Sequence, residues 1–369
     1  MISLPSMLKY QRHLGLTGQW LLQSVARGNP GSSAYFSPIL GWSGPYPETT
    51  GYLIPTLFAL HNRFPDHGYD QAARHAGNWL LDIQHDNGAW PGGVHRANRQ
   101  GHPSVFNTGQ VIRGLLALDD ATKDNGWLAA ALRAAEWLAA GVGDDGQWQL
   151  QDYRSANTPS YYTYVASPML DVWRRTEDRG IHDASERVLD LVLRRRQTNG
   201  AFAHWGFAEG EPGFTHVIGY TVAGLLEAAR LTGDWTRYGA PATQALETLR
   251  TKSELNHGRL SGAFDLDWSE TVKAVCLTGN AQIAICLLVW EEQAHDLRLV
   301  NAAAKLMDEV CRRQWVHSWP KSLRGAVGGS SPLWGRYMTM RYPNWAAKYH
   351  CDALMSLIDR LSCEVESTT

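Results

Sequence analysis

The feature that most constrains the fold is a unit of two helical segments and a long loop that recurs six times. In each unit a charged helical segment precedes a loop rich in Gly and aromatic residues, and a second segment of small and apolar residues follows. The second segments begin near Pro47, Phe106, Tyr161, Thr215, Cys276 and Pro343. Their spacing of roughly 54–67 residues is typical of a supersecondary repeat.

Six such units predict twelve helices arranged as an all-α (α/α)6 toroid. The predicted helices cover about residues 5–26, 48–63, 69–84, 107–119, 127–140, 161–175, 183–196, 216–231, 237–252, 276–292, 297–315 and 345–360. The charged first helices suit an outer ring, and the second helices, rich in small residues, suit a closely packed inner ring. The long loops then leave at one end, where six polar helix starts line a shared cavity. No linker divides the chain, so we expect residues 1–369 to form one domain.

A short motif precedes several of the long loops. Gly88, Gly146 and Gly200 each follow Asn or Asp, and an aromatic residue comes two positions later. Glycine in this position is typical of a helix end in the left-handed conformation. We expect the aromatic residue to pack the loop back onto the toroid.

The composition favours a carbohydrate ligand over nucleic acid. The net charge is -2, so there is no basic footprint for nucleic acid. The chain has 16 Trp and 14 Tyr but only 8 Phe, and Trp and Tyr combine an apolar face with a polar group, as sugar-binding surfaces require. An oligo- or polysaccharide is therefore the expected partner, and the oligomeric state stays open.

The five cysteines have no paired spacing, which predicts reduced thiols in a cytoplasmic protein. No apolar run is long enough for a transmembrane segment, and the N-terminal residues do not have the pattern of a signal peptide. Because no Cys-x-x-Cys or His-x-x-x-His pair exists, we expect no metal site, and no motif indicates a cofactor.

The candidate catalytic residues lie at helix starts and in one loop. Glu48 would be a general acid or base, or alternatively a charge that stabilises the helix N-terminus. His216 and Tyr220 are four residues apart and so share one helix face, and Tyr162 adds a phenol at the neighbouring helix start. The alternative for these three is buried aromatic packing. Asp267, with Asp265, would act as an acid/base group or belong to a solvated loop.

The candidate substrate-binding residues are amides, aromatic side chains and cations. Amides could fix sugar hydroxyls, aromatic rings could stack on sugar faces, and cations could neutralise a carboxylate. Lys348 could instead pair with Asp352 one helical turn later. The full set is Asn107, Gln110, Asn280 and Gln282; Trp90, Trp205, Trp268, Trp334, Tyr337 and Trp345; and His95 and Lys348, with Arg96, Arg336 and Arg341 as further cations.

Several of these motifs resemble known families. Residues 47–52 (PETTGY), 276–282 (CLTGNAQ) and 343–348 (PNWAAK) are similar to motifs of helical-toroid proteins encoded in bacterial exopolysaccharide and O-antigen gene clusters. Residues 90–93 (WPGG), 109–110 (GQ) and 158–160 (TPS) more weakly resemble glucuronyl C5-epimerases. The Gly-aromatic repeat also resembles the toroids of squalene cyclases and protein prenyltransferase β subunits, but their Asp-x-Asp-Asp run and zinc ligands are missing here.

The resemblances imply an enzyme that acts on an acidic, uronate-containing bacterial polysaccharide. The expected reaction removes the C5 proton of a uronate and leads to epimerisation or β-elimination. His216 and Tyr220 would exchange the proton while Lys348 or an Arg holds the carboxylate. Two alternatives stay open. One is a glycoside hydrolase that uses Glu48 with Asp265 or Asp267, and the other is a non-catalytic glycan-binding protein of polysaccharide assembly.

Overall fold

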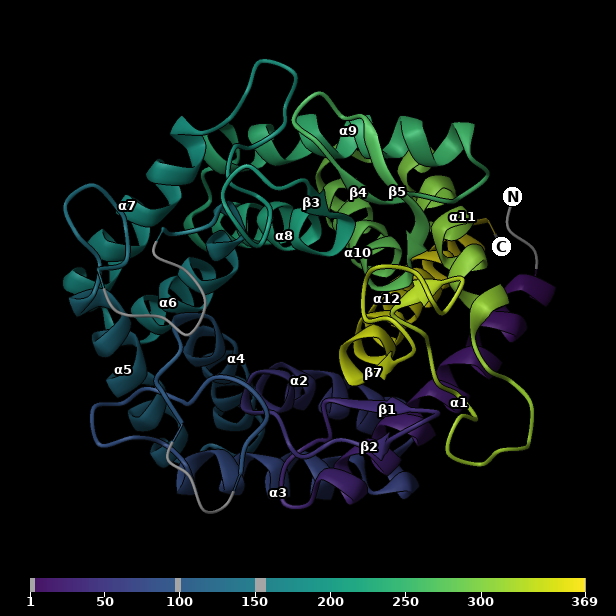
Figure 1. Cartoon of the computed structure of the whole chain (residues 1–369), viewed down its shortest axis with the longest axis horizontal. Coiled ribbons are helices and arrows are strands. Elements are labelled where there is room, and N and C mark those ends of the chain that lie inside the picture. The colour runs from purple at the N-terminus through teal and green to yellow at the C-terminus, as the bar shows by residue number, and fades with distance from the viewer. Residues whose placement is uncertain (1–3, 97–100, 150–156, 369) are drawn as a thin grey trace.

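The computed structural model describes residues 4–96, 101–149 and 157–368, and these contain twelve α-helices in two concentric rings (Figure 1). The inner ring consists of α2 (Pro47–Arg63), α4 (Val105–Thr122), α6 (Thr163–Thr176), α8 (Thr215–Thr232), α10 (Leu277–Ala294) and α12 (Asn344–Thr368). The outer ring consists of α1 (Leu4–Gly28), α3 (Tyr69–Asp82), α5 (Asn125–Ala140), α7 (Arg179–Arg194), α9 (Ala240–Leu255) and α11 (Leu297–Arg313). The predicted (α/α)6 toroid is confirmed.

The ring closes between its first and last helices. Each inner helix packs against the outer helix that follows it, and α12 packs against α1 in the same way. α12 also contacts its inner-ring neighbours α10 and α2, so the inner ring is continuous. The first helix, α1, and the last helix, α12, consequently lie side by side at this seam (Figure 1).

Small residues bring the inner helices into backbone contact, as the sequence predicts. A Cβ atom on Gly114 of α4 would lie 2.4 Å from the carbonyl oxygen of Gly51 in α2. A Cβ atom on Gly224 of α8 would lie 2.3 Å from the carbonyl carbon of Thr163 in α6. Any larger residue at either position would push two inner helices apart.

The Gly-aromatic motif fixes each loop to the next hairpin. Gly88 has φ +91° and approaches the backbone of Arg133 in α5 so closely that a Cβ atom would lie 2.4 Å from the Arg133 oxygen. Trp90 then turns into the core, where it is fully buried and its Nε1 donates a hydrogen bond to the Leu80 oxygen at 2.7 Å. The structure therefore gives Trp90 a packing role and does not place it as a stacking surface for sugar.

The loops contain short strands that an all-α prediction omits. The first sheet has the order β2 (Gly41–Trp42), β1 (Tyr35–Ser37) and β7 (Tyr342–Pro343), and the second has the order β3 (Gly213–Phe214), β4 (Ser261–Phe264), β5 (Glu270–Cys276) and β6 (Ser330–Ser331). All pairs are antiparallel, and Tyr35 faces Pro343 in register. Strand pairing thus joins loops of different hairpins, which no local sequence pattern could reveal.

Three further turns flank the helices: 3-10 turns at Pro65–His67 and Ser160–Tyr162, and a π-helical turn at Trp235–Gly239. The turn at Ser160–Tyr162 matters for the site, because it presents two tyrosines at the start of α6. Within the part of the chain that the structure describes, no helix has both the length and the apolarity needed to cross a membrane.

Candidate functional site

A cavity of about 270 Å³ lies where inner helices begin. Its walls come from the start of α2, α4, α6, α8 and α12, and from the loops before α8 and α12. They comprise Tyr46, Glu48, Ser104, Phe106, Asn107, Tyr161, Tyr162, Phe207, Phe214, His216, Val217, Tyr220, Arg336, Tyr337, Met338 and Trp345. Four predicted catalytic residues, Glu48, Tyr162, His216 and Tyr220, therefore share one cavity. Among the described lining residues none belongs to α10, so five of the six inner helix starts meet here.

His216 is a neutral imidazole in this wall. Its side chain is buried, and burial lowers its pKa to about 4, against the opposing effect of a hydrogen bond with Gln282. The His216 Nδ1 lies 2.8 Å from the Oε1 atom of Gln282. An amide oxygen only accepts hydrogen bonds, so Nδ1 carries the proton and Nε2 keeps its lone pair. The arrangement presents a base of defined tautomer.

Tyr220 packs directly against this base. The ring centroids of His216 and Tyr220 lie 4.4 Å apart, and Tyr164 stacks on Tyr220 at 4.7 Å. Burial raises the pKa of Tyr220 well above its usual value, and the nearby Tyr52 and Glu48 raise it further. Tyr220 therefore stays a neutral phenol that can donate a proton or a hydrogen bond.

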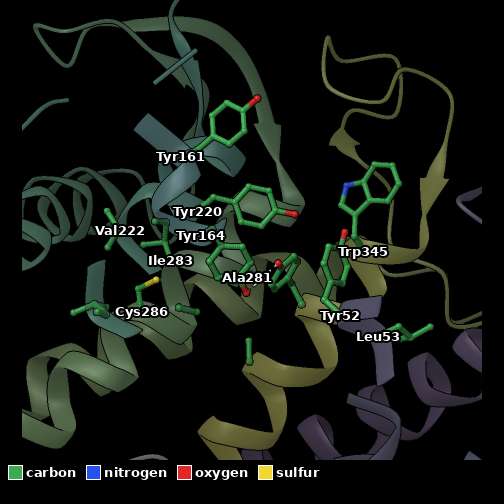
Figure 2. Close-up of a cluster of buried hydrophobic side chains, with 14 of the residues drawn as sticks. Tyr52, Leu53, Tyr161, Tyr164, Tyr220, Val222, Ala281, Ile283, Cys286 and Trp345 are labelled. Carbon is green, nitrogen blue, oxygen red and sulfur yellow. Dashed lines mark hydrogen bonds between the residues drawn. The ribbon is translucent and has the colours of Figure 1, made fainter. Parts of the chain in front are cut away.

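Figure 2 shows Tyr52, Tyr164 and Tyr220 together in one cluster of buried side chains. Tyr52 and Tyr220 come from opposite sides and point their hydroxyl ends toward the same space, below Trp345 and Tyr161. The hydroxyls of Tyr349 and Tyr164 are 3.4 Å apart. Tyr220 lines the cavity described above, whereas Tyr52 and Tyr164 line a second one, so this aromatic cluster lies between the two.

The second cavity, of about 690 Å³, lies toward the other ends of the inner helices and is lined by paired charges. Arg113 Nη1 lies 2.6 Å from Glu227 Oε2, and Lys348 Nζ lies 2.7 Å from Asp352 Oδ2. The Lys348 ammonium also lies 4.0 Å from the centroid of the Tyr349 ring. The structure thus places Lys348 in the second cavity and Glu48 in the first, and the charge of Lys348 is already paired.

The cation that the structure does bring into the first cavity is Arg336, on the loop that precedes α12. Its side chain is exposed, so the guanidinium is open to solvent and to a ligand. Among the described lining residues it is the only Lys or Arg. The cation available to an acidic ligand in this cavity is therefore Arg336, whereas the sequence favoured Lys348.

Of the four predicted amide ligands, only Asn107 lines the cavity. Its Nδ2 donates to the Pro91 oxygen at 2.8 Å, which leaves the amide oxygen for another partner. Gln110 and Asn280 are fully buried and donate to the backbone oxygens of Tyr164 and Gly258, both at 3.0 Å. Gln282 does not line the cavity, but its side chain hydrogen-bonds to His216, which does. The side-chain amides of Gln110 and Asn280 therefore satisfy buried backbone carbonyl groups of neighbouring segments.

Two predicted stacking residues, Tyr337 and Trp345, line the cavity, and the Trp345 Nε1 donates to the Tyr337 hydroxyl at 2.8 Å. The structure places Trp268 and Trp334 elsewhere. Trp268 is buried, and its Nε1 donates to the Asn199 oxygen at 3.1 Å. Trp334 is 73% exposed and lies outside the cavity wall.

Asp267 and His95 also lie outside the cavity wall. Asp267 is exposed in the turn between β4 and β5, where the Asp265 Oδ1 accepts hydrogen bonds from the backbone nitrogens of Asp267 and Ser269 at 3.0 and 2.7 Å. His95 packs edge-on against Trp79 with centroids 5.6 Å apart. The structure thus places Asp267 in a turn that Asp265 caps, outside the cavity wall. Sequence reasoning also missed the apolar wall of Phe106, Phe207 and Phe214, for which the only signal was loop aromaticity.

Comparison with known proteins defines a fold class. The solved structures similar to this chain include an unsaturated glucuronyl hydrolase from Bacillus sp. GL1, with a TM-score of 0.71, 14% identity, and coverage of 94% of this chain and 96% of that one. Cellobiose 2-epimerases from Bacillus thermoamylovorans (TM-score 0.73, 14% identity, 96% and 99% coverage) and Spirochaeta thermophila (0.69, 16%, 97% and 99%) are similar as well. At these identities the likeness shows the (α/α)6 toroid fold alone. No family model and no curated sequence matches the chain.

Proposed function

We propose that this chain is a carbohydrate-active enzyme that binds an acidic sugar unit of a bacterial oligo- or polysaccharide and transfers a proton at its C5 carbon. The observation that supports this most directly is a neutral His216 of defined tautomer, in contact with the Tyr220 phenol inside a cavity that also contains Arg336. Proton removal next to a carboxylate needs a base, an acid and a cation, and these three residues supply them.

The size and the walls of the cavity support a single sugar unit as the bound group. A volume of about 270 Å³ is near the lower end of ligand pockets, which hold small molecules in roughly 300–1,000 Å³. Tyr337 and Trp345 offer apolar faces with polar edges, as a sugar ring requires. Proteins of the same fold are named as hydrolases of unsaturated glucuronyl groups and as cellobiose epimerases.

In the proposed reaction, His216 Nε2 takes the C5 proton and the electron pair moves into the carboxylate, whose charge Arg336 balances. A bound uronate places negative charge near His216, which raises the pKa of the imidazole and makes it a stronger base. Return of a proton from the Tyr220 phenol to the opposite face of C5 gives the C5 epimer, and proton exchange with water then restores neutral His216 and Tyr220. Loss of the oxygen substituent at C4, which then takes a proton from Tyr220 or Glu48, gives the unsaturated product.

Incubation with uronate oligosaccharides in deuterium oxide tests the proposal. Epimerisation introduces deuterium at C5, measured by mass spectrometry and NMR, and elimination adds a double bond with new ultraviolet absorbance. The His216→Gln variant should lose either signal. Absence of both signals with glucuronate, galacturonate and mannuronate oligosaccharides would refute proton transfer at C5.

Glycoside hydrolysis is the second candidate, favoured by the hydrolases of the same fold and by Glu48 in the cavity wall. Two-carboxylate hydrolysis needs a partner carboxylate roughly 5–10 Å away. Glu48 is the only carboxylate among the described lining residues, and Asp265 and Asp267 lie outside the cavity wall. New reducing ends without deuterium at C5 would favour hydrolysis, and binding without any product would favour a non-catalytic glycan-binding protein.

A further inference from the structure

Three potential metal ligands from three different helices converge at the seam where the toroid closes. They are His13 on α1, Cys311 on α11 and His350 on α12, and one ligand atom of each lies within 4.8 Å of the other two. We propose that these residues bind a zinc ion. None of them lines the cavity described above, so this site is separate from the proposed reaction.

His350 gives an independent reason to place a ligand here. Its side chain is fully buried, and neither ring nitrogen has a hydrogen-bond partner among the described residues. A buried polar group without a partner is costly, and the great majority of such groups in folded proteins are satisfied. Coordination of one nitrogen to a metal ion would give this imidazole the partner that the protein does not supply.

His13 is held as a metal-binding histidine usually is. Its Nδ1 hydrogen-bonds to the Gln314 Oε1, which leaves Nε2 as the nitrogen available for a metal. Gln314 is itself fixed, because its Nε2 donates to the backbone oxygens of His13 and Gly325 at 3.2 and 3.1 Å. Metal-binding histidines commonly donate their second N–H to a carbonyl group, which sets the ring orientation.

The donor set and its spacing select zinc. Two imidazole nitrogens and one thiolate suit Zn²⁺, which binds His at about 2.0–2.1 Å and Cys at about 2.3 Å in tetrahedral geometry. Those bond lengths place ligand atoms roughly 3.3–3.6 Å apart, so contraction from a spread of at most 4.8 Å needs only small side-chain rotations. A water molecule can supply the fourth ligand.

The position of the site predicts its consequence. α1 and α12 close the ring, and α11 packs against both α10 and α12. A zinc ion held by α1, α11 and α12 would tie the first helix to the last hairpin. Because a metal that binds only the folded state stabilises it by mass action, zinc should raise the unfolding temperature of the whole toroid.

The test uses the full-length protein with zinc and with cobalt as a spectroscopic probe. Purified protein should contain about one zinc per chain, and removal of the metal by a chelator should lower the unfolding temperature by several degrees, restored by added Zn²⁺. Co²⁺ in place of Zn²⁺ should give a thiolate-to-metal charge-transfer band. Cys311→Ser should lose that band, whereas Cys286→Ser, which alters an equally buried thiol outside the cluster, should keep it.

His350→Gln gives a second route if the Cys311 variant fails to fold, since it should lose stoichiometric metal while the thiol remains. Zinc should also protect the Cys311 thiol of the wild-type protein from alkylation. Less than stoichiometric zinc with no cobalt band in folded wild-type protein would overturn the proposal. So would a band that survives Cys311→Ser, or copper in the purified protein in place of zinc.

Discussion

The Nδ1 atom of His216 lies 2.8 Å from the Oε1 atom of Gln282, so that α10 fixes the tautomer of a base carried by α8. Replacement of Gln282 by Leu removes the acceptor and leaves the imidazole free to change tautomer. We expect kcat to fall roughly 10–100-fold, less than the about 10²–10⁴-fold that a general base contributes in full, because the base remains and only its tautomer is released. KM should change little because Gln282 does not line the cavity. Gln282→Glu restores an acceptor and should recover activity. Equal losses in both variants would show that Gln282 acts through packing only.

Burial of His216 makes stability depend on pH in a defined window. Its pKa of about 4 in the folded state lies below the ordinary value of 6.5, so the unfolded chain binds a proton first as the pH falls. The contribution of the neutral imidazole to the free energy of unfolding is complete above pH 6.5. It decreases between pH 6.5 and 4 and is lost below pH 4. At about 1.4 kcal/mol per pKa unit, the total is roughly 3 kcal/mol.

The measurement compares the free energy of unfolding of the wild type and His216→Gln between pH 7.5 and 4. The difference between the two proteins should shrink toward acid pH, because only the wild type has this proton-linked term. Other histidines whose pKa burial lowers, such as His85 and His95, are common to both proteins and cancel. A difference that stays constant over this range would mean that His216 titrates near its ordinary pKa when folded.

Much of the fold could be predicted because helical periodicity is local. α3 and α8 begin and end within two residues of their predicted limits. The start of α7 was placed too late, because Asp178 caps it by accepting a hydrogen bond from the Ile181 nitrogen at 3.0 Å. Strand pairing between loops is long-range, so β1 and β7 escaped prediction. That the whole chain forms one domain stays a prediction.

Part of the site could be predicted from residues at helix starts, such as Glu48 and Asn107, and from two residues that share a helix face. His216 and Tyr220 are in contact, as their spacing of four implies. Which face of an inner helix points to the axis was not predictable, because inner helices are buried by neighbours on several sides. Asn280 therefore binds backbone and does not reach the cavity. His13, Cys311 and His350 come from three helices, so no spacing could indicate them.

Mutation of Glu48 and of Asp267 distinguishes the proposed reaction from two-carboxylate hydrolysis. Glu48 lines the cavity, whereas Asp267 is exposed in the β4–β5 turn. We expect Glu48→Gln to reduce kcat about 10²-fold or more, since a general acid or base contributes about 10²–10⁴. Asp267→Asn should keep wild-type kcat and KM in the same assay. A comparable loss in the Asp267 variant would reinstate this residue in the reaction and revive the two-carboxylate hydrolase.

The ion pair between Lys348 and Asp352 distinguishes a structural cation from a substrate ligand. The Lys348 side chain is 8% exposed, Asp352 also accepts a hydrogen bond from the Thr56 hydroxyl at 2.8 Å, and both residues line the second cavity. Lys348→Met leaves a largely buried carboxylate without its counter-charge, so we expect unfolding to become easier by about 3 kcal/mol, the lower end for a broken buried pair. Lys348→Met with Asp352→Asn removes both charges and should recover part of that loss.

Affinity for a uronate oligosaccharide, measured by calorimetry, should remain within a factor of about 3 in the double variant because Lys348 does not line the first cavity. Arg336→Ala should weaken the same binding at least tenfold, which corresponds to about 1.4 kcal/mol. The opposite pattern, with affinity lost in the lysine variants and retained in Arg336→Ala, would move the sugar site to the second cavity.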